Sequence, residues 1–312
     1  MNVERDNWNS IWDDAKALQM LGVAADKLNL PADCVNALAQ AQQSIVAVPA
    51  AFEAVKNAAV CLMDVQEDAC REQLQLAAQK SGVPFITVVA VMLITAIPMM
   101  ERIYADKGLP EDLMWDTLID VRCKLQEEYD CSGVWGTAAV GWYVRLYRAA
   151  IIKLGRLEFE PIGYKWDTPY RGIQKGDPVL NVHIPSCGGL PIEAVIDSLK
   201  RAHTFFAAEY GTVQTYVCAS WLLYPPICEE VMKPDSNMKK FYNLFEVVEQ
   251  YEDPENKNFW RVFNVDYAEG VLDKAPTDTS LRRGIYNMMK SGRHMGIGRC
   301  MLQFDGEKII SK

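Results

Sequence analysis

The pattern of apolar and polar positions changes part-way along the chain. Up to about residue 133, apolar residues recur at spacings of three and four, which predicts a series of amphipathic helices. The expected helices cover Ile11–Leu21, Pro31–Gln43, Pro49–Val60, Glu67–Lys80, Phe85–Ala105 and Leu109–Glu128. Glycine and proline at 82–84 and 107–110 predict turns between helices. This part is therefore predicted to be all-helical.

Beyond Asp130–Gly133, which we take as a boundary, strand patterns alternate with helices. An amphipathic helix is expected over Ala138–Leu154. The expected strands are Arg156–Tyr164, Val179–Ile184, Thr215–Leu223, Phe245–Tyr251 and Gly296–Phe304, and the expected helices are 191–209, 226–231, 236–243 and 278–291. This order predicts a mixed α/β sheet with helices packed on it. The fold class is therefore α+β, with a helical domain over 1–133 and a sheet domain over 134–312.

The length and net charge of the chain indicate how many domains it has and which classes of binding partner it favours. At 312 residues the chain is long enough for two domains. A net charge of −9 and a pI near 5.0 argue against a general nucleic-acid surface, which needs clustered Lys and Arg. A local site can still bind an anion, because its charge can oppose the global sign.

The chain carries no pattern that predicts a membrane partner or a metal. Its N-terminus lacks a basic segment followed by an apolar one, and the most apolar run, 85–100, contains Pro98 and is shorter than the roughly 20 residues of a membrane helix. The nine cysteines include no CxxC pair, which indicates buried thiols in a cytoplasmic protein. The three histidines have no metal-ligand spacing with the cysteines, so we expect no metal.

The segment Asp177–Glu193 combines a strand, a glycine turn and a helix start. Pro185 ends the strand, because proline cannot donate to a sheet ladder. Gly188 and Gly189 allow unusual backbone angles, and Pro191 suits the first position of a helix. A turn that opens a helix presents free N–H groups and a positive dipole end. The turn at 186–190 is thus a candidate phosphate site.

Several segments together are similar to a known family. They are Leu146–Glu160, Val182–Pro185 with the two glycines and Leu190, Cys218–Leu223 and Ser236–Phe241. This sequence resembles the two-domain bacterial acyltransferase-like proteins, which join an N-acyltransferase N-terminal domain to a GNAT-like C-terminal domain. The likeness is specific over 138–245. It implies acyl-CoA or acetyl-CoA as co-substrate and a small-molecule acceptor, expected to be an amine.

The resemblance also implies positions for the cofactor. In GNAT proteins the central strand diverges from its neighbour, and the pantetheine arm lies between them. Val182–Ile184 would be the central strand and Val217–Leu222 its neighbour. The cofactor-binding residues would be Val182, Ile184, Ser186, Cys187, Gly188, Gly189, Leu190 and Asn237.

One GNAT signature is missing from this turn. The phosphate motif, Arg or Gln followed by x-x-Gly-x-Gly/Ala, is absent from 186–190. A sequence that matches the motif occurs at Arg293–Gly298. Only 14 residues follow Gly298, however, which is too few for the helix and two strands that come after a GNAT phosphate turn. Residues 293–298 are therefore expected to enter the last strand.

The catalytic candidates each have a structural alternative. His183 is either a structural histidine or a general base at the cleft. The resemblance implies Tyr242 as general acid to the leaving thiolate, and Asn237 as a partner of the pantetheine arm, whereas Ser236 and Asn237 could simply cap a helix. Cys187, near a helix N-terminus, could form a nucleophile pair with His183.

Three hypotheses follow from these residues. The first is a GNAT-like acyltransferase that uses acyl-CoA. The second is a catalytically inactive GNAT-shaped scaffold that binds a ligand or a protein, which the missing phosphate motif favours. The third is a thiol enzyme built on Cys187. Arg171 and Lys175 are further candidates for contact with a phosphate or an acidic substrate, and Trp135, Trp166 and Tyr170 for the walls of an acceptor cleft.

Overall fold

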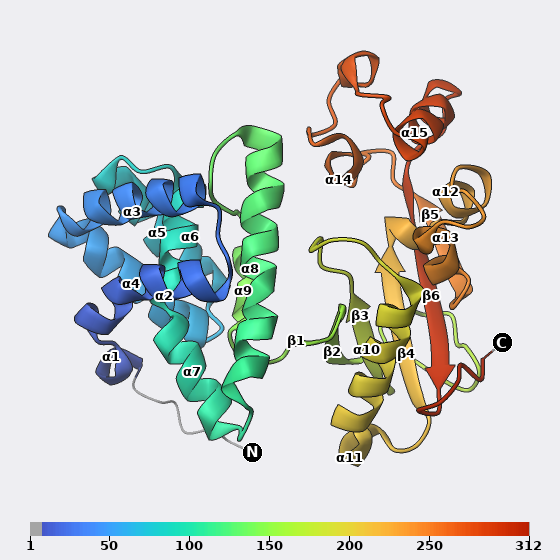
Figure 1. Ribbon diagram of the computed structural model, residues 1–312, viewed down its shortest axis with the longest axis horizontal. Coiled ribbons are helices and arrows are strands. Elements are labelled where there is room, and N and C mark those ends of the chain that lie inside the picture. The colour runs from blue at the N-terminus through green and yellow to red at the C-terminus, as the bar shows by residue number, and fades with distance from the viewer. Residues whose placement is uncertain (1–7, 312) are drawn as a thin grey trace. The chain divides into compact units, whose positions relative to one another are not determined.

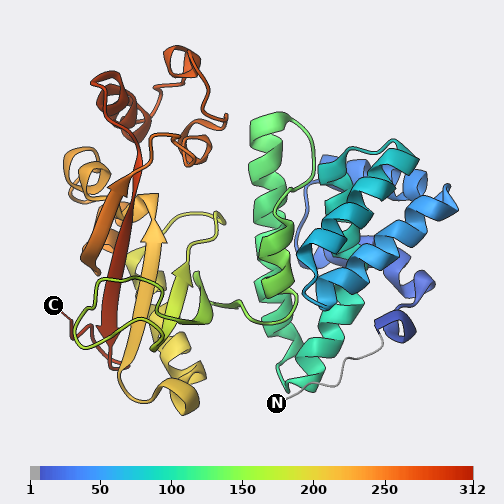
Figure 2. The same ribbon diagram turned by 180° about the vertical axis from the view of Figure 1, so that it is seen from behind.

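A computed structural model describes residues 8–311, whose contacts divide them into two compact units (Figures 1 and 2). The first unit ends at Ile152 and the second begins at Lys153. The first consists of helices and the second contains a six-stranded mixed sheet, so the α+β prediction is confirmed.

The first unit is built around one apolar helix. Its helices are α1 Trp8–Ile11, α2 Asp14–Lys27, α3 Ala32–Val46, α4 Pro49–Met63, α5 Glu67–Ser81, α6 Phe85–Thr95, α7 Ile97–Asp106, α8 Glu111–Ser132 and α9 Val140–Leu146. Every residue of α6 from Thr87 to Thr95 is buried, and α6 packs against α2, α3, α4, α5 and α7. A helix that is apolar on all sides needs such complete burial.

The sequence predicted one helix where α6 and α7 lie. The break falls at Ala96, and Pro98 stands in the first turn of α7. Proline has no N–H for the carbonyl of Ile94 and its ring would clash with that carbonyl, so a continuous helix is disfavoured there. Among the described residues, no single helix is long and apolar enough to cross a membrane, although two bent pairs, α3 with α4 and α5 with α6, meet that test together.

The chain passes from helices to sheet through α9. The Trp142 indole donates to Oδ2 of the buried Asp120 on α8 at 2.6 Å, and α9 also packs against α4 and α5. The helix expected over Ala138–Leu154 therefore ends early. After α9 the backbone turns, with a positive φ of 49° at Ala149, and continues as strand β1.

The second unit is a mixed sheet with the order β1-β2-β3-β4-β6-β5. Its strands are β1 Ile152–Leu154, β2 Leu157–Gly163, β3 Pro178–His183, β4 Gln214–Ser220, β5 Glu246–Glu252 and β6 Gly296–Phe304. Its helices are α10 Ile192–Phe205, α11 Ala207–Tyr210, α12 Pro225–Glu230, α13 Asn237–Tyr242, α14 Trp260–Phe263 and α15 Ser280–Lys290, with 3₁₀ turns η1 Trp221–Leu223 and η2 Val271–Lys274. Only β3 and β4 run parallel among the pairs β2–β3, β3–β4, β4–β6 and β5–β6.

The two faces of the sheet are covered differently. Helix α10 crosses one face (Figure 1). On this face the rings of Phe159 and Tyr216 meet edge to face, with their centroids 5.8 Å apart. The segment after β2 runs over the other face (Figure 2). There Tyr164 and Trp166 pack in one buried cluster with Val179, Val217 and Met301. The sheet therefore has a helix-covered face and a loop-covered face.

Strand β6 begins at Gly296, which confirms that residues 293–298 enter the last strand. A Cβ at Gly298 would overlap the carbonyl group of Leu223, and one at Gly296 would overlap the Tyr224 ring. The chain around η1 thus lies directly on the start of β6. Close packing of the backbone requires glycine at these two positions. The match of residues 293–298 to the GNAT phosphate motif is therefore coincidental.

Candidate functional site

Strands β3 and β4 pair only over part of their length. Their ladder consists of Leu180 with Tyr216 and Asn181 with Val217, and it ends there. Beyond that point Val182 pairs only with Phe159 of β2, while β4 continues to pair with β6. The facing edges of the two central strands therefore leave backbone groups that do not bond across to each other.

The loop after β3 is the turn expected from the sequence. β3 ends at His183, so Ile184 lies just outside the strand. Ser186, Gly188 and Gly189 are exposed, and Gly188 has a φ of +88° that favours glycine. Pro191 is the N-cap of α10 and supplies no side-chain hydrogen bond. The first turn of α10 is therefore left without a protein cap.

Several backbone N–H groups of this loop are unused. Within residues 8–311, the N–H groups of Gly189, Leu190, Ile192 and Glu193 donate to no acceptor. The N–H of Gly188, in contrast, donates to the Ser186 carbonyl at 2.8 Å. Unused N–H groups around a helix N-terminus, together with the helix dipole, favour an anion.

An arginine from elsewhere in the chain contacts this loop. Arg156 lies in the turn between β1 and β2, and its guanidinium donates from Nε to the Gly189 carbonyl at 2.7 Å and from Nη2 to the Gly188 carbonyl at 3.0 Å. The backbone N–H of Arg156 donates to Oγ of Ser198 on α10 at 2.6 Å. Residues 186–190 contain no Arg or Gln, but a guanidinium does reach them.

His183 belongs to a polar group on the loop-covered face of the sheet. Its Nε2 lies 2.9 Å from Oε2 of Glu160 on β2 and 3.2 Å from Nδ2 of Asn181. The side chains of His183 and Glu160 are 19% and 8% exposed. A histidine that is held by a carboxylate and keeps a solvent path can exchange protons with a bound substrate.

Sequence reasoning did not single out Glu160 or Asn181. Glu160 and Asn181 are direct partners in the β2–β3 register, so their side chains share a face with His183. The available signal was the pair of acidic residues, Glu158 and Glu160, at alternate positions of an otherwise apolar strand. The register that brings Glu160 to His183 was not readable from either strand alone.

The Tyr242 hydroxyl donates to Oε1 of Glu229 at 2.8 Å. Burial raises the pKa of Tyr242, and the hydrogen bond to Glu229 raises it further. Its helix, α13, packs against α10 and η1.

Ser236 caps α13, because its Oγ accepts from the N–H of Lys239 at 3.2 Å. The structural alternative for Ser236 is thus observed, while Asn237 stands exposed in the first turn of the helix.

Arg171 and Lys175, the two basic candidates of the loop after β2, bond to carboxylates of this chain. Arg171 donates to both carboxylate oxygens of Glu246, each at 2.9 Å, and Lys175 pairs with Asp167 at 2.7 Å. Trp166 packs in the buried cluster on the sheet. Trp135 is also buried, in the first unit, where it stacks on Tyr129.

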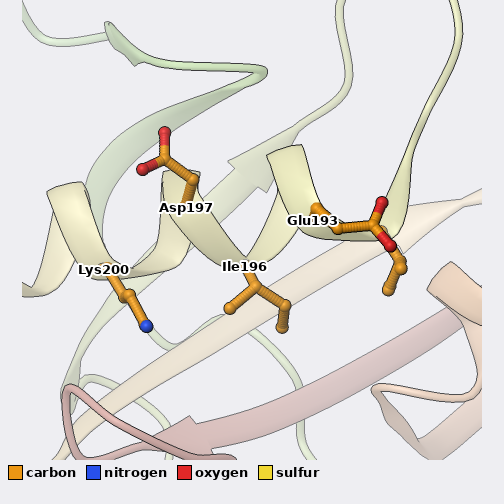
Figure 3. Close-up of a pocket in the computed structure, with 5 residues that line it drawn as sticks. Glu193, Ile196, Asp197 and Lys200 are labelled. Carbon is orange, nitrogen blue, oxygen red and sulfur yellow. The ribbon is translucent and has the colours of Figure 1, made fainter.

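The exposed side of α10 carries a pocket of about 340 Å³. It is lined by Ile192, Glu193, Ile196, Asp197 and Lys200, of which four are labelled in Figure 3. The pocket thus starts at the same helix end as the candidate phosphate loop. In the part of the chain that the structure describes, no group of three or more His, Cys, Asp or Glu is placed to hold a metal ion.

Two protein-family models match the chain, one in each half. The N-acyltransferase N-terminal domain matches residues 21–149, and the GNAT-like C-terminal domain matches residues 151–302. The chain belongs to this two-domain family. The resemblance inferred from the sequence is therefore confirmed.

Solved structures have the same fold as this GNAT-like chain. A mutant acyltransferase in complex with octanoyl-CoA has a TM-score of 0.71 and 23% identity, covering 89% of this chain and 85% of that one. An acyltransferase in complex with decanoyl-CoA and teicoplanin has a TM-score of 0.69 and 23% identity, covering 89% and 86%. At this identity the likeness shows the fold. A search of curated proteins finds no match.

Proposed function

We propose that this protein is an acyltransferase that moves an acyl group from acyl-CoA to a small acceptor, expected to be an amine. The observation that carries the proposal is the conjunction of two features at the end of β3. The β3–β4 ladder stops after Asn181 and Val217, and the loop that follows leaves unused N–H groups at the start of α10. The solved neighbours bind octanoyl-CoA or decanoyl-CoA, which supports the same class of co-substrate.

The acyl-CoA would be held mainly by backbone. The diphosphate would accept from the N–H groups of Gly189, Leu190, Ile192 and Glu193 at the α10 dipole. The pantetheine arm would bond to the facing edges of β3 and β4, where the strands do not bond to each other. Loss of either contact region would weaken CoA binding.

Catalysis would combine positioning with proton transfer. The His183 imidazole would accept the proton of the attacking amine, and the hydrogen bond between its Nε2 and Oε2 of Glu160 would fix the ring. The amine nitrogen would add to the thioester carbon, and collapse of the tetrahedral intermediate would expel the CoA thiolate. The Tyr242 hydroxyl would protonate that thiolate. Its raised pKa keeps the hydroxyl protonated while it is bonded to Glu229, before the proton is transferred.

The thiol-enzyme hypothesis for Cys187 stays a separate prediction. Cys187 is half-buried in the phosphate loop, and a cytoplasmic location would keep its thiol reduced. Rapid alkylation of Cys187 by iodoacetamide at neutral pH would favour it. Slow labelling of Cys187, at the rate of the other half-buried thiols, Cys61 and Cys131, would remove it.

The test is a transfer assay that follows release of the CoA thiol. Acetyl-, octanoyl- and decanoyl-CoA are offered with a panel of primary amines. Thiol release that depends on both protein and amine, with an acylated product seen by mass spectrometry, supports the proposal. Tight CoA binding without any transfer would instead favour the inactive scaffold.

A further inference from the structure

We propose that Arg156 is a positioning residue that orients the N–H groups of the phosphate loop toward the CoA diphosphate. The inference rests on the proposed function and deepens it, because it names the side chain that gives the loop its binding conformation. Arg156 lies 32 residues before Gly188 in the sequence, and its guanidinium bonds two successive carbonyl groups of the loop.

The planarity of the peptide bond fixes the direction in which the loop N–H groups point. In a trans peptide the C=O of one residue and the N–H of the next point in opposite directions. The carbonyls of Gly188 and Gly189 both point toward Arg156. The N–H groups of Gly189 and Leu190 must therefore point away from Arg156. These are two of the loop N–H groups that have no acceptor among residues 8–311.

Arg156 is itself fixed to the helix that the loop begins. Oγ of Ser198 accepts from the backbone N–H of Arg156 at 2.6 Å and from that of Leu157 at 3.2 Å, and it donates to the Ala194 carbonyl at 2.9 Å. A Cβ at Gly155 would come within 2.8 Å of the same Oγ, so the turn lies close against α10. The turn, the loop and the first turns of α10 thus form one connected unit.

Guanidinium geometry suits this task better than an ammonium group. The planar fork of arginine can bond two acceptors at once in fixed directions, whereas lysine presents a point charge. The charge behind the loop also favours an anion in front of it. A role in orienting the loop therefore predicts that both arginine geometry and arginine charge matter.

The test compares CoA with pantetheine, which lacks the phosphates. Affinities for both ligands are measured by calorimetry for the wild type, Arg156→Ala, Arg156→Lys and the control Arg201→Ala. Arg201 lies on α10, where its guanidinium pairs with the exposed Asp197 and makes no hydrogen bond to the loop. The control therefore removes the same charge without releasing the carbonyls.

We expect Arg156→Ala to weaken CoA binding by about tenfold or more, the scale of one charge-assisted hydrogen bond. Arg156→Lys should weaken CoA binding at least about threefold, because lysine cannot bond both carbonyl groups in the fixed directions of a guanidinium. The affinity for pantetheine should change less than about twofold in both variants, and Arg201→Ala should bind CoA like the wild type.

Two results would overturn the proposal while the function stands. One is an Arg156→Lys variant that binds CoA with wild-type affinity, because a positive charge alone would then be sufficient for CoA binding. This result overturns the proposal even if Arg156→Ala fails to fold. The other is an equal loss for pantetheine and CoA, which indicates general disruption. No CoA binding by the wild type would overturn both this inference and the proposed function.

Discussion

His183 on β3 and Glu160 on β2 form a close pair, with Nε2 and Oε2 2.9 Å apart on the loop-covered face of the sheet. The pair lies at the end of β3, next to the point where β3 and β4 cease to bond to each other. Both side chains are largely shielded from solvent. A carboxylate that fixes an imidazole beside a strand end is an arrangement suited to general base catalysis.

Replacement of the imidazole tests its catalytic role. His183→Ala should lower kcat by about 100-fold or more, the usual contribution of a positioned general base. The Kd for CoA should stay within about twofold, because the diphosphate would bind at 189–193. Steady-state kinetics and calorimetry measure the two quantities. A parallel loss of CoA affinity would assign His183 a structural role.

Removal of the charge on Glu160 tests the orientation of the imidazole. Glu160→Gln should lower kcat by about tenfold while the KM for acyl-CoA stays constant, because the ring loses its carboxylate partner at Nε2. The exposed Glu209→Gln on α11 is the control and should behave like the wild type. An unchanged kcat in Glu160→Gln would show that the pair does not serve catalysis.

The two loop glycines should differ in what they tolerate. Gly188 has a φ of +88°, so Gly188→Ala should destabilise the protein by about 1 kcal/mol through backbone strain. Gly189 has an ordinary φ and its Cβ would come no nearer than 4.0 Å to another residue, so Gly189→Ala should leave stability unchanged. Chemical denaturation of the ligand-free variants makes the comparison. Equal destabilisation would contradict this loop conformation.

A pH dependence of stability follows from Glu249 on β5. Hydrogen bonds from Thr168 and Arg299 hold the pKa of Glu249 below its ordinary value of 4.5. A depressed folded-state pKa stabilises the fold above about pH 4.5, and this stabilisation is lost as the pH falls through the folded value. Glu249→Gln should therefore lower Tm at pH 7, and the difference from the wild type should close in acid. A difference that grows on acidification would contradict the assignment.

Local patterns in the sequence predicted most of the second unit. Strands β2 to β6 and helices α10, α12, α13 and α15 lie where alternation, helical spacing and proline signals placed them. The main miss is the end of the helix expected over Ala138–Leu154. The apolar run that forms β1 is only three residues long, and so short a run fits a helix and a strand equally well.

The conformation of the loop at 186–190 was predicted from sequence because its signals are local. A strand, a proline, two glycines and a helix start follow one another within residues 178–192. Its Arg156 contact could not be found that way, because the turn between β1 and β2 approaches the loop only in the folded sheet. The pairing of Glu160 with His183 likewise depends on the register of two strands. Nonlocal contacts of this kind require the structure.

Calorimetric titration of the wild-type protein with CoA and with decanoyl-CoA tests the central claim most directly. We predict saturable binding of both ligands, and competition by free CoA against decanoyl-CoA, because the same diphosphate site would hold each. The absence of heat with either ligand at millimolar concentration, confirmed by the lack of any shift in Tm, would contradict the assignment of an acyl-CoA site to residues 186–193.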